Sequence, residues 1–367
     1  SAGLSFNVAA APGEANTFII QMPAVKPSDF DSDLLKQKRF WKDELSRVYI
    51  DIPEMRIVDV MRTNVAYILI NKDGPWIKPG SRNYSHSWIR DGALTSAAIL
   101  RMGINDEVKQ WLDAVASKVT DDGYVPYLIF EGGNPIGLND HGTGEGVEWD
   151  AQGEFVYAVR NYVDYSGDRG YLPSIYPKVV KALEFTRNLR RRNMGEEFKN
   201  DPKKKPYYGL LPKSNSHEGY YPAQTSYWDD FFAIRGFRDG IYLAELMKDA
   251  EGAEWMRKEL DDFRKCLYES IRLVVERDRL DYIPGCVEKG DFDATSTAIA
   301  IVAAGELEYM PKELLKKTFD KYYAEFVRGM VPGKERTFTP YEVRTANAFF
   351  KMDQRDRGLT MLRYFLK

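Results

Sequence analysis

The stretch DGALTSAAILRMGINDEVKQWLDAV, residues 91–115, contains the two kinds of helix from which most of the chain is built. Its first part, from Ala93 to Met102, is apolar nearly all round, which is typical of a helix that is buried on every side. A short turn at 103–105 follows. The second part then has apolar residues at the i, i+3, i+4, i+7 spacing of a helix that buries one face, namely Val108, Trp111, Leu112 and Val115. This succession predicts two packed helical layers.

The same alternation continues along the chain. Helices that are apolar nearly all round are predicted at 91–102, 150–165, 227–248, 293–304 and 341–352, and amphipathic helices at 54–71, 105–118, 175–190, 251–277, 311–328 and 354–366. A further helix, rich in charge, is predicted near 32–45. Strict alternation of one-face-buried and fully buried helices requires two concentric layers. The sequence therefore predicts an all-α fold, an (α/α)6 toroid of alternating outer and inner helices.

The first residues have a different pattern. Residues 4–8 and 17–22 have the composition of short strands, and Pro12-Gly13 separates them. Residues 1–29 are therefore predicted as a β-like segment. It is either the tail of a preceding domain or a strand pair that packs on the helical body, and the sequence does not separate the two. Residues 30–367 are predicted as one α/α-barrel catalytic domain.

Composition excludes several classes of protein. The chain of 367 residues is 44% apolar and has a net charge of −3, so it is neither disordered nor a typical nucleic-acid binder. No apolar run has membrane-spanning length, so no membrane insertion is expected. The only cysteines, Cys266 and Cys286, provide neither a disulfide framework nor a cysteine metal site. They do not settle the compartment, and a secreted or periplasmic location is favoured.

Three predicted inner helices begin with a tryptophan next to carboxylates. An aromatic ring stacks on the C–H face of a sugar, while Asp, Arg and Gln side chains bind its hydroxyl groups. Each segment alone also fits a structural interpretation, in which Asp91, Asp150 and Asp229 cap helices and the tryptophans are core residues. Three such segments at one end of a barrel favour a sugar-binding site. Its predicted residues are Trp88, Arg90, Asp91, Trp149, Asp150, Gln152, Tyr227, Trp228, Asp229 and Asp230.

The segment Ser216-His217-Glu218-Gly219-Tyr220 contains the predicted catalytic residue, Glu218. A glycosidase needs a carboxylic acid that an apolar or aromatic setting keeps partly protonated, and the neighbouring tyrosines together with Trp228 could supply that setting. The alternative is a surface Glu that pairs with Lys213. His217 is predicted to bind substrate. The three histidines, His86, His141 and His217, are interpreted as polar lining rather than as a metal site, and no cofactor is expected.

These motifs resemble those of the glucoamylase-type six-hairpin glycoside hydrolases. The segment from Trp88 to Thr95 is similar to the Trp-Arg-Asp segment on the first inner helix of that family, where the Arg-Asp pair binds the non-reducing sugar. Asp150-Ala151-Gln152-Gly153-Glu154 is similar to the start of the second inner helix, and Glu218 falls where the general acid of the family lies. The resemblance covers about residues 55–250. It implies hydrolysis of an oligo- or polysaccharide with inversion. The motif around Glu218 departs from the usual glucoamylase setting, which leaves the sugar open.

Two other functions fit parts of the sequence. A non-catalytic, carbohydrate-binding α/α barrel would retain the tryptophans, Arg90 and Asp91 but would lack a working acid and base pair. A terpenoid cyclase is suggested by Asp291-Phe292-Asp293-Ala294-Thr295 and by Asp229-Asp230-Phe231-Phe232-Ala233. Both motifs lack an aspartate that such an enzyme requires, so this function is disfavoured.

The predicted helices number six outer ones and five inner ones. In the family that the chain resembles, the general base lies just before the last inner helix. The sequence therefore predicts that this helix and the partner carboxylate follow residue 367, and that an apolar groove is exposed in their place. Within the chain, the carboxylates that could substitute are Glu288, Asp293, Glu335 and Glu342.

Overall fold

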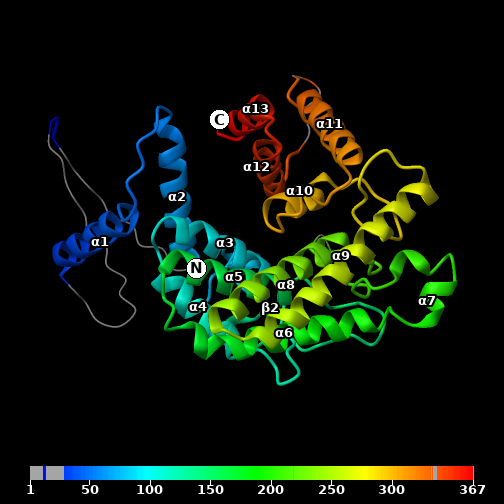
Figure 1. Ribbon diagram of the computed structural model, residues 1–367. Helices are drawn as coiled ribbons and strands as arrows, with labels where there is room; N and C mark the ends of the chain where they lie inside the picture. Colours follow the sequence, from blue (N-terminus) through cyan, green and yellow to red (C-terminus); the bar gives the residue numbers. More distant parts are fainter. Residues whose placement is uncertain (1–10, 14–28, 218, 332, 334–336, 367) are drawn as a thin grey trace, which may run out of the picture. The chain divides into compact units, whose positions relative to one another are not determined.

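The computed structural model describes residues 11–13, 29–217, 219–331, 333 and 337–366 (Figure 1). The chain divides into two compact units, residues 1–47 and 48–367. The strands predicted at 4–8 and 17–22 fall outside the described residues. In the first unit the structure describes one helix, α1 (Phe30–Leu45), close to the predicted 32–45. Asp29 caps it by accepting a hydrogen bond from the backbone N–H of Asp31, and none of its side chains is buried.

Five helices of the second unit form an inner layer, and each packs against the next. They are α3 (Ile89–Arg101), α5 (Ala151–Ser166), α8 (Tyr227–Met247), α10 (Ala294–Val302) and α12 (Val343–Lys351). Their bounds agree with the five predicted inner helices to within a few residues. In α5, an unbroken run of buried residues extends from Ala151 to Val159, as expected for a helix with neighbours on every side.

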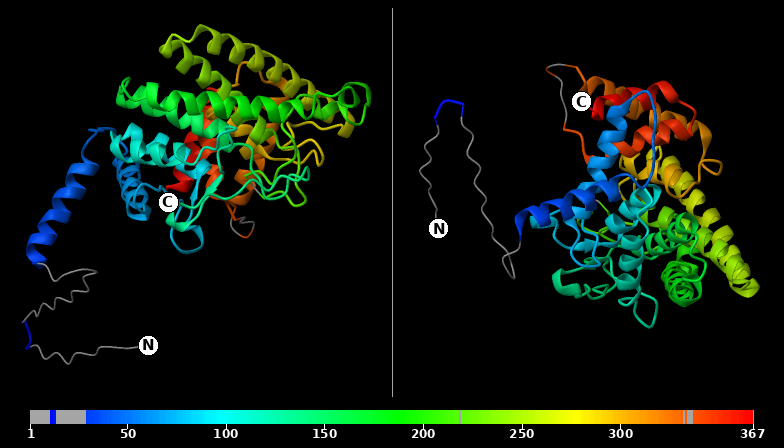
Figure 2. Two further views of the ribbon diagram at one scale, coloured as in Figure 1. Left: turned by 90° about the horizontal axis from the view of Figure 1, so that it is seen from below. Right: turned by 90° about the vertical axis from the view of Figure 1, so that its left-hand side faces the viewer.

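The outer layer consists of helices that bury one stripe only. They are α2 (Met55–Asn71), α4 (Asp106–Ala116), α6 (Leu172–Arg191), α9 (Ala250–Asp278), α11 (Lys312–Gly329) and α13 (Arg355–Phe365). In α4 the buried residues are the predicted ones, Val108, Trp111, Leu112 and Val115. Each of α6, α9, α11 and α13 packs on the inner helix that precedes it, and α6 and α9 also lie side by side (Figure 2). The predicted all-α architecture of alternating outer and inner helices is confirmed.

Short elements join the helices. Strand β1 (Ser87–Trp88) pairs antiparallel with β2 (Leu128–Ile129), and α7 (Glu196–Asn200) is a helix of little more than one turn. Four single 3-10 turns complete the described set: η1 (Arg82–Tyr84), η2 (Glu131–Gly133), η3 (Lys205–Tyr207) and η4 (Pro340–Glu342). Two-residue strands have no periodicity, and the sequence did not predict them. Among the described helices, none has both the length and the apolar character needed to cross a membrane.

The inner helices α5 and α8 approach closely because glycine lies at their contact. A Cβ atom on Gly153 would lie 2.0 Å from the carbonyl oxygen of Phe232, and one on Gly236 would lie 2.9 Å from the Cα of Gly153. No larger residue fits at Gly153 without moving backbone. The crossing thereby fixes the first turns of α5 and α8 relative to each other, and these turns contain the candidate site.

Candidate active site

Arg90, in the first turn of α3, joins the loops that lead into the inner helices. Its Nη1 lies 2.7 Å from Glu148 Oε2 and 2.8 Å from Asp150 Oδ2, just before α5. The Arg90 side chain is buried, so both ion pairs form largely out of water and resist screening by salt. The first two predicted segments are thus brought together around one guanidinium group.

Two carboxyl groups beside Arg90, those of Asp91 and Glu148, remain partly exposed. Glu148 binds Arg90 through Oε2, and its side chain is 15% exposed. Burial raises the pKa of Glu148 to about 7, although Arg90 opposes the shift. Burial likewise raises the pKa of Asp91, again against the effect of Arg90. Glu148 can therefore gain or lose a proton near neutral pH more readily than an ordinary carboxylate can.

Beneath these groups lies a buried carboxyl layer. Asp150 Oδ2 accepts a 2.8 Å hydrogen bond from Trp228 Nε1 as well as the contact with Arg90. Glu154, one turn further along α5, is completely buried, and neither of its carboxyl oxygens has a hydrogen-bond partner in the described residues. Burial, reinforced by the negative charge of Asp150, raises the pKa of Glu154 well above its usual range. Burial therefore disfavours the charged form of Glu154, whereas Asp150 and Glu148 pair with Arg90.

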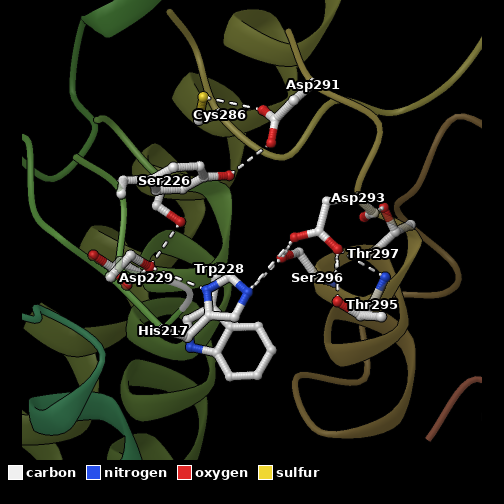
Figure 3. A network of polar contacts seen from close by, with 12 residues as sticks. His217, Ser226, Trp228, Asp229, Cys286, Asp291, Asp293, Thr295, Ser296 and Thr297 are labelled. Carbon is white, nitrogen blue, oxygen red and sulfur yellow. Dashed lines mark hydrogen bonds and ion pairs between the residues drawn. The ribbon is translucent and has the colours of Figure 1, made fainter. Parts of the chain in front are cut away.

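His217 connects this cluster to α10 (Figure 3). Its ring stacks on Trp228 with the centroids 3.9 Å apart, and its Nε2 lies 3.1 Å from Ser296 Oγ and 3.5 Å from Asp293 Oδ2. Asp293 caps α10 and also accepts hydrogen bonds from the backbone N–H groups of Thr295 and Ser296. Although burial opposes it, the contact with His217 and the hydrogen bonds from the hydroxyl groups of Ser296 and Thr295 hold the pKa of Asp293 well below its usual range. Asp293 is accordingly a fixed anion.

Asp229 lies in the first turn of α8 and is buried under the loop that precedes this helix. It accepts hydrogen bonds from Ser214 Oγ at 2.5 Å and from Ser216 Oγ at 2.7 Å. Burial, followed by the nearby charge of Asp150, raises its pKa well above the usual range, against the effect of the two serines. Ser216 also bonds to Ser226 and contacts the ring of His217, and it does so with a positive φ of 52°. The loop is thus held onto the start of α8.

The remaining predicted residues lie deeper, and each bonds to the scaffold. Trp149 Nε1 donates to the carbonyl oxygen of Lys213, and Gln152 Nε2 donates to that of Val125. Asp230 accepts from the backbone N–H of Leu211, and burial raises its pKa to about 8. Tyr227 shares a hydrogen bond with Ser270. These four side chains and that of Trp228 are at most 1% exposed, which places them behind the surface of the site. Trp88 and Asp91 are partly exposed.

The helix-capping interpretation of the three aspartates does not hold. No side chain caps α3, α5 or α8, because Asp91 and Asp229 lie inside the first turn and Asp150 makes no capping hydrogen bond. Asp150 and Asp229 bond within the cluster instead. Across the described parts of the chain, no three His, Cys, Asp or Glu side chains are arranged to hold a metal ion.

Glu218 itself lies outside the described residues, and so does Glu335. The other carboxylates named as substitutes for a base are already engaged. Glu288 accepts from the N–H and the hydroxyl of Thr225, and Glu342 accepts from the Tyr322 hydroxyl and the N–H of Thr339. Asp293 is bound as described above. Glu148 is engaged as well, through the ion pair of its Oε2 with Arg90, but its pKa is raised to about 7.

Sequence reasoning missed two residues of the site. Glu148 stood in the Glu-Trp-Asp segment, yet only Trp149 and Asp150 were selected there, since sequence does not show which of the three faces the opening. Arg344, on α12, has its guanidinium carbon 5.0 Å from the ring centroid of Trp228 and 4.6 Å from that of Tyr341. A single Arg in a short helix carries no signal of this contact.

No protein-family model matches the sequence, and no curated protein matches it. Solved structures share its fold. A wild-type glycosidase superimposes with a TM-score of 0.62 and 13% identity over 86% of this chain and 85% of that one. A glycosidase variant in complex with glucose gives a TM-score of 0.61 and 14% identity over 87% and 85%.

Two longer proteins contain the same arrangement. A rhamnosidase from Klebsiella oxytoca with rhamnose bound gives a TM-score of 0.52 and 14% identity, with 85% of this chain and 55% of that one covered. A GH78 family rhamnosidase of a Bacillus species gives 0.51 and 15%, with 78% and 27% covered. At such low identity the likeness concerns the fold alone. This chain has the α/α-barrel fold that these glycosidases have.

Proposed function

We propose that this protein is a glycoside hydrolase that cleaves an oligo- or polysaccharide with inversion at the anomeric carbon, and that Glu218 is its general acid. One observation carries the proposal. Asp91 and Glu148 flank Arg90 at the open ends of the inner helices, and burial raises the pKa of both carboxyl groups. A glycosidase needs carboxyl groups that exchange protons near neutral pH at a site that binds hydroxyl groups. The fold shared with glycosidases supports the same function.

The assignment of Glu218 draws its support from the residues on either side of it. His217 is stacked on Trp228, and Tyr220 is buried with its hydroxyl 3.0 Å from Asp291. The backbone that leads to Glu218 and away from it is therefore anchored among aromatic rings. We infer that Glu218 shares this aromatic setting, which would favour the protonated form that a general acid requires.

We further propose that Glu148 is the general base. In the reaction, Glu218 donates its proton to the glycosidic oxygen as the bond to the anomeric carbon breaks. Glu148 takes a proton from a water molecule, whose oxygen bonds to that carbon from the opposite face. The products are the inverted sugar and the freed alcohol, and both carboxyl groups return to their starting state by proton exchange with solvent. Arg90 holds Glu148, and Trp88 with Asp91 binds the sugar.

A panel of 4-nitrophenyl glycosides and oligosaccharides tests the function, and the Glu218→Gln variant tests the acid. The variant should lose several orders of magnitude in kcat on ordinary glycosides, because the leaving oxygen is no longer protonated. The corresponding glycosyl fluoride, whose leaving group needs no proton, should be partly spared. Proton NMR of the first product follows the configuration at the anomeric carbon.

Equal losses on both substrates would show that Glu218 does not donate the proton. A folded protein that binds oligosaccharide in calorimetry but turns over no member of the panel would instead be a carbohydrate-binding barrel. Glu196→Gln is a suitable control variant. Glu196 lies on the exposed helix α7 and accepts hydrogen bonds from Lys199 and Asn200, remote in sequence from the proposed site residues.

A further inference from the structure

The motif Thr143-Gly144-Glu145-Gly146 has no part in the proposed reaction, yet it joins the two loops that lead into α5 and α8. The backbone N–H of Asn215 donates to the carbonyl oxygen of Val147 at 3.0 Å, and the N–H of Gly146 donates to Asn215 Oδ1 at 2.6 Å. Val147 directly precedes Glu148, and Asn215 lies shortly before Glu218. We call this contact between residues 144–147 and residues 213–215 the seam. In the sequence it lies next to both proposed catalytic carboxyl groups.

Glu145 spans the second loop from one side to the other. Its Oε2 accepts from Asn215 Nδ2 at 2.9 Å, and its Oε1 accepts from the backbone N–H of Ala223 at 2.8 Å. Residues 215 and 223 flank the segment with His217 and Glu218, and paired bonds between the backbones of Ser214 and Gln224 close its base. One carboxylate thus fixes both sides of the loop.

The two loops can approach closely enough to form these hydrogen bonds only because residue 144 is a glycine. Gly144 has a φ of 77°, and a Cβ atom there would lie 2.3 Å from the carbonyl oxygen of Lys213. That same carbonyl accepts the hydrogen bond from Trp149 Nε1. Both the backbone angle and the close approach exclude other residues at position 144. Ordinary surface loops are more mobile and tolerate many sequence changes. The seam instead requires a glycine and is crossed by several hydrogen bonds, which indicates that the relative position of the two loops matters.

We propose that Glu145 and Asn215 are positioning residues that set the placement of the loop of His217 and Glu218 relative to Glu148. This inference rests on the proposed function. Inversion requires the acid and the base to lie on opposite sides of the sugar at a fixed separation, and a shift of about 1 Å can cost about 100-fold in rate. The seam provides that placement through hydrogen bonds rather than through helix packing.

The hydrogen-bonding capacity of the two side chains provides a sharp test. In Glu145→Gln, the amide NH2 must face a donor, either Asn215 Nδ2 or the N–H of Ala223, and turning the Asn215 amide moves the conflict to Gly146. In Asn215→Asp, two carboxylates face each other. The double variant restores the pattern, because the new amide at position 145 donates to the new carboxylate at position 215, which still accepts from Gly146. It loses the bond from Asn215 Nδ2 to the carbonyl oxygen of Tyr220, and a carboxylate oxygen faces that carbonyl instead, so the restoration is partial.

The experiment measures kcat and KM of the wild type, both single variants, the double variant and Glu196→Gln on the 4-nitrophenyl glycoside that the wild type hydrolyses best and on the matching fluoride. We expect each single variant to lose about 10- to 100-fold in kcat on the glycoside, with little change in KM. The fluoride should lose less, and the double variant should regain part of the loss relative to Asn215→Asp, because both variants share the altered contact with Tyr220. Amide hydrogen exchange at Gly146 and Ala223 should rise in the single variants and fall again in the double variant.

The outcomes separate the two proposals. Folded single variants with wild-type kcat would overturn the positioning role, whatever Glu218→Gln does. A double variant no better than the single variants, in both kcat and amide exchange, would overturn it as well. If Glu218→Gln leaves activity intact while the Glu145 and Asn215 variants behave as expected, the assignment of the acid fails and the seam positions another group of the loop.

Discussion

At the scale of single residues, Glu148 combines two properties that usually exclude each other. It forms an ion pair with Arg90, yet burial raises its pKa to about 7 rather than lowering it. The largest cause is burial, and the nearby negative charge of Asp150, which also pairs with Arg90, adds to it. A carboxyl group in this state binds a proton weakly enough to release it and strongly enough to take it up again.

Glu148 should make the stability of the protein depend on pH. The folded chain keeps this proton up to about pH 7, whereas the unfolded chain loses it near the ordinary value of 4.5. The folded state therefore binds more protons between these values, and its stability falls as the pH rises through this window. Glu148→Gln, which mimics the protonated form, should be more stable relative to the wild type at pH 8 than at pH 5, by about 2–3 kcal/mol. Urea denaturation at both pH values measures this, and equal differences at the two would refute it.

Which residues belong to the site could be predicted from sequence only in part. The tryptophan beside an aspartate at the start of each apolar helix predicted that these segments lie together, and Arg90, Asp150 and Trp228 are indeed in contact. The sequence did not separate the partly exposed residues of the cluster from the buried ones, because both kinds are polar. Asp230 and Gln152 are bonded to the backbone of neighbouring loops, and Arg344 reaches the site from far along the chain. Depth and long-range contact are properties of packing.

At the scale of elements, the bounds of the helices were the most predictable feature. An outer helix must have an apolar stripe and a polar face, and an inner helix must be apolar nearly all round, so composition and period together identify the layer. The predicted 227–248 and 251–277 compare with α8 at 227–247 and α9 at 250–278. The glycine contact of α5 and α8 was not predictable, because a glycine inside a helix gives no indication of the partner that needs it.

Gly153→Ala should test that contact. The added methyl group would lie 2.0 Å from the carbonyl oxygen of Phe232, so that α5 and α8 must move apart. We expect a loss of about 3 kcal/mol in the free energy of unfolding, at the upper end for overpacking. Gly170→Ala is the matched control, since its nearest atom would be Asp168 Oδ1 at 3.5 Å, and it should change stability by less than about 1 kcal/mol. Denaturant titration of both variants measures these changes in the free energy of unfolding. If Gly153→Ala is as stable as the wild type, the two helices can move apart at little cost.

At the scale of the whole molecule, the inner layer is a succession of five helices within the described part of the chain. Each packs on its neighbour from α3 to α12, and no packing of similar extent joins α12 to α3 within the residues that the structure describes. Several apolar side chains of α2 are exposed, among them Met55 at 46%, Tyr67 at 60% and Ile70 at 62%. The sixth inner helix and the groove that its absence would leave stay predictions, which the described residues do not test.

The division into two units predicts that the second one folds by itself. The described core residues belong to 48–367, whereas α1 has no buried side chain. A protein that consists of residues 48–367 should therefore unfold cooperatively, with a Tm within about 2 °C of that of the full chain. Calorimetric scans of both proteins provide the comparison. A marked fall in Tm, or the loss of a cooperative transition, would show that residues 1–47 contribute to the stability of the barrel.

The stack of His217 on Trp228 has an optical consequence. An indole ring in a dry environment emits at short wavelength, and an imidazole ring in face-to-face contact quenches that emission most strongly when it is protonated. Trp228 is completely enclosed and His217 lies flat against it, so this tryptophan should be nearly dark among the seven of the chain. Any ligand that lifts the loop of His217 would brighten it. An increase in tryptophan emission during a ligand titration would therefore show that the two rings had separated.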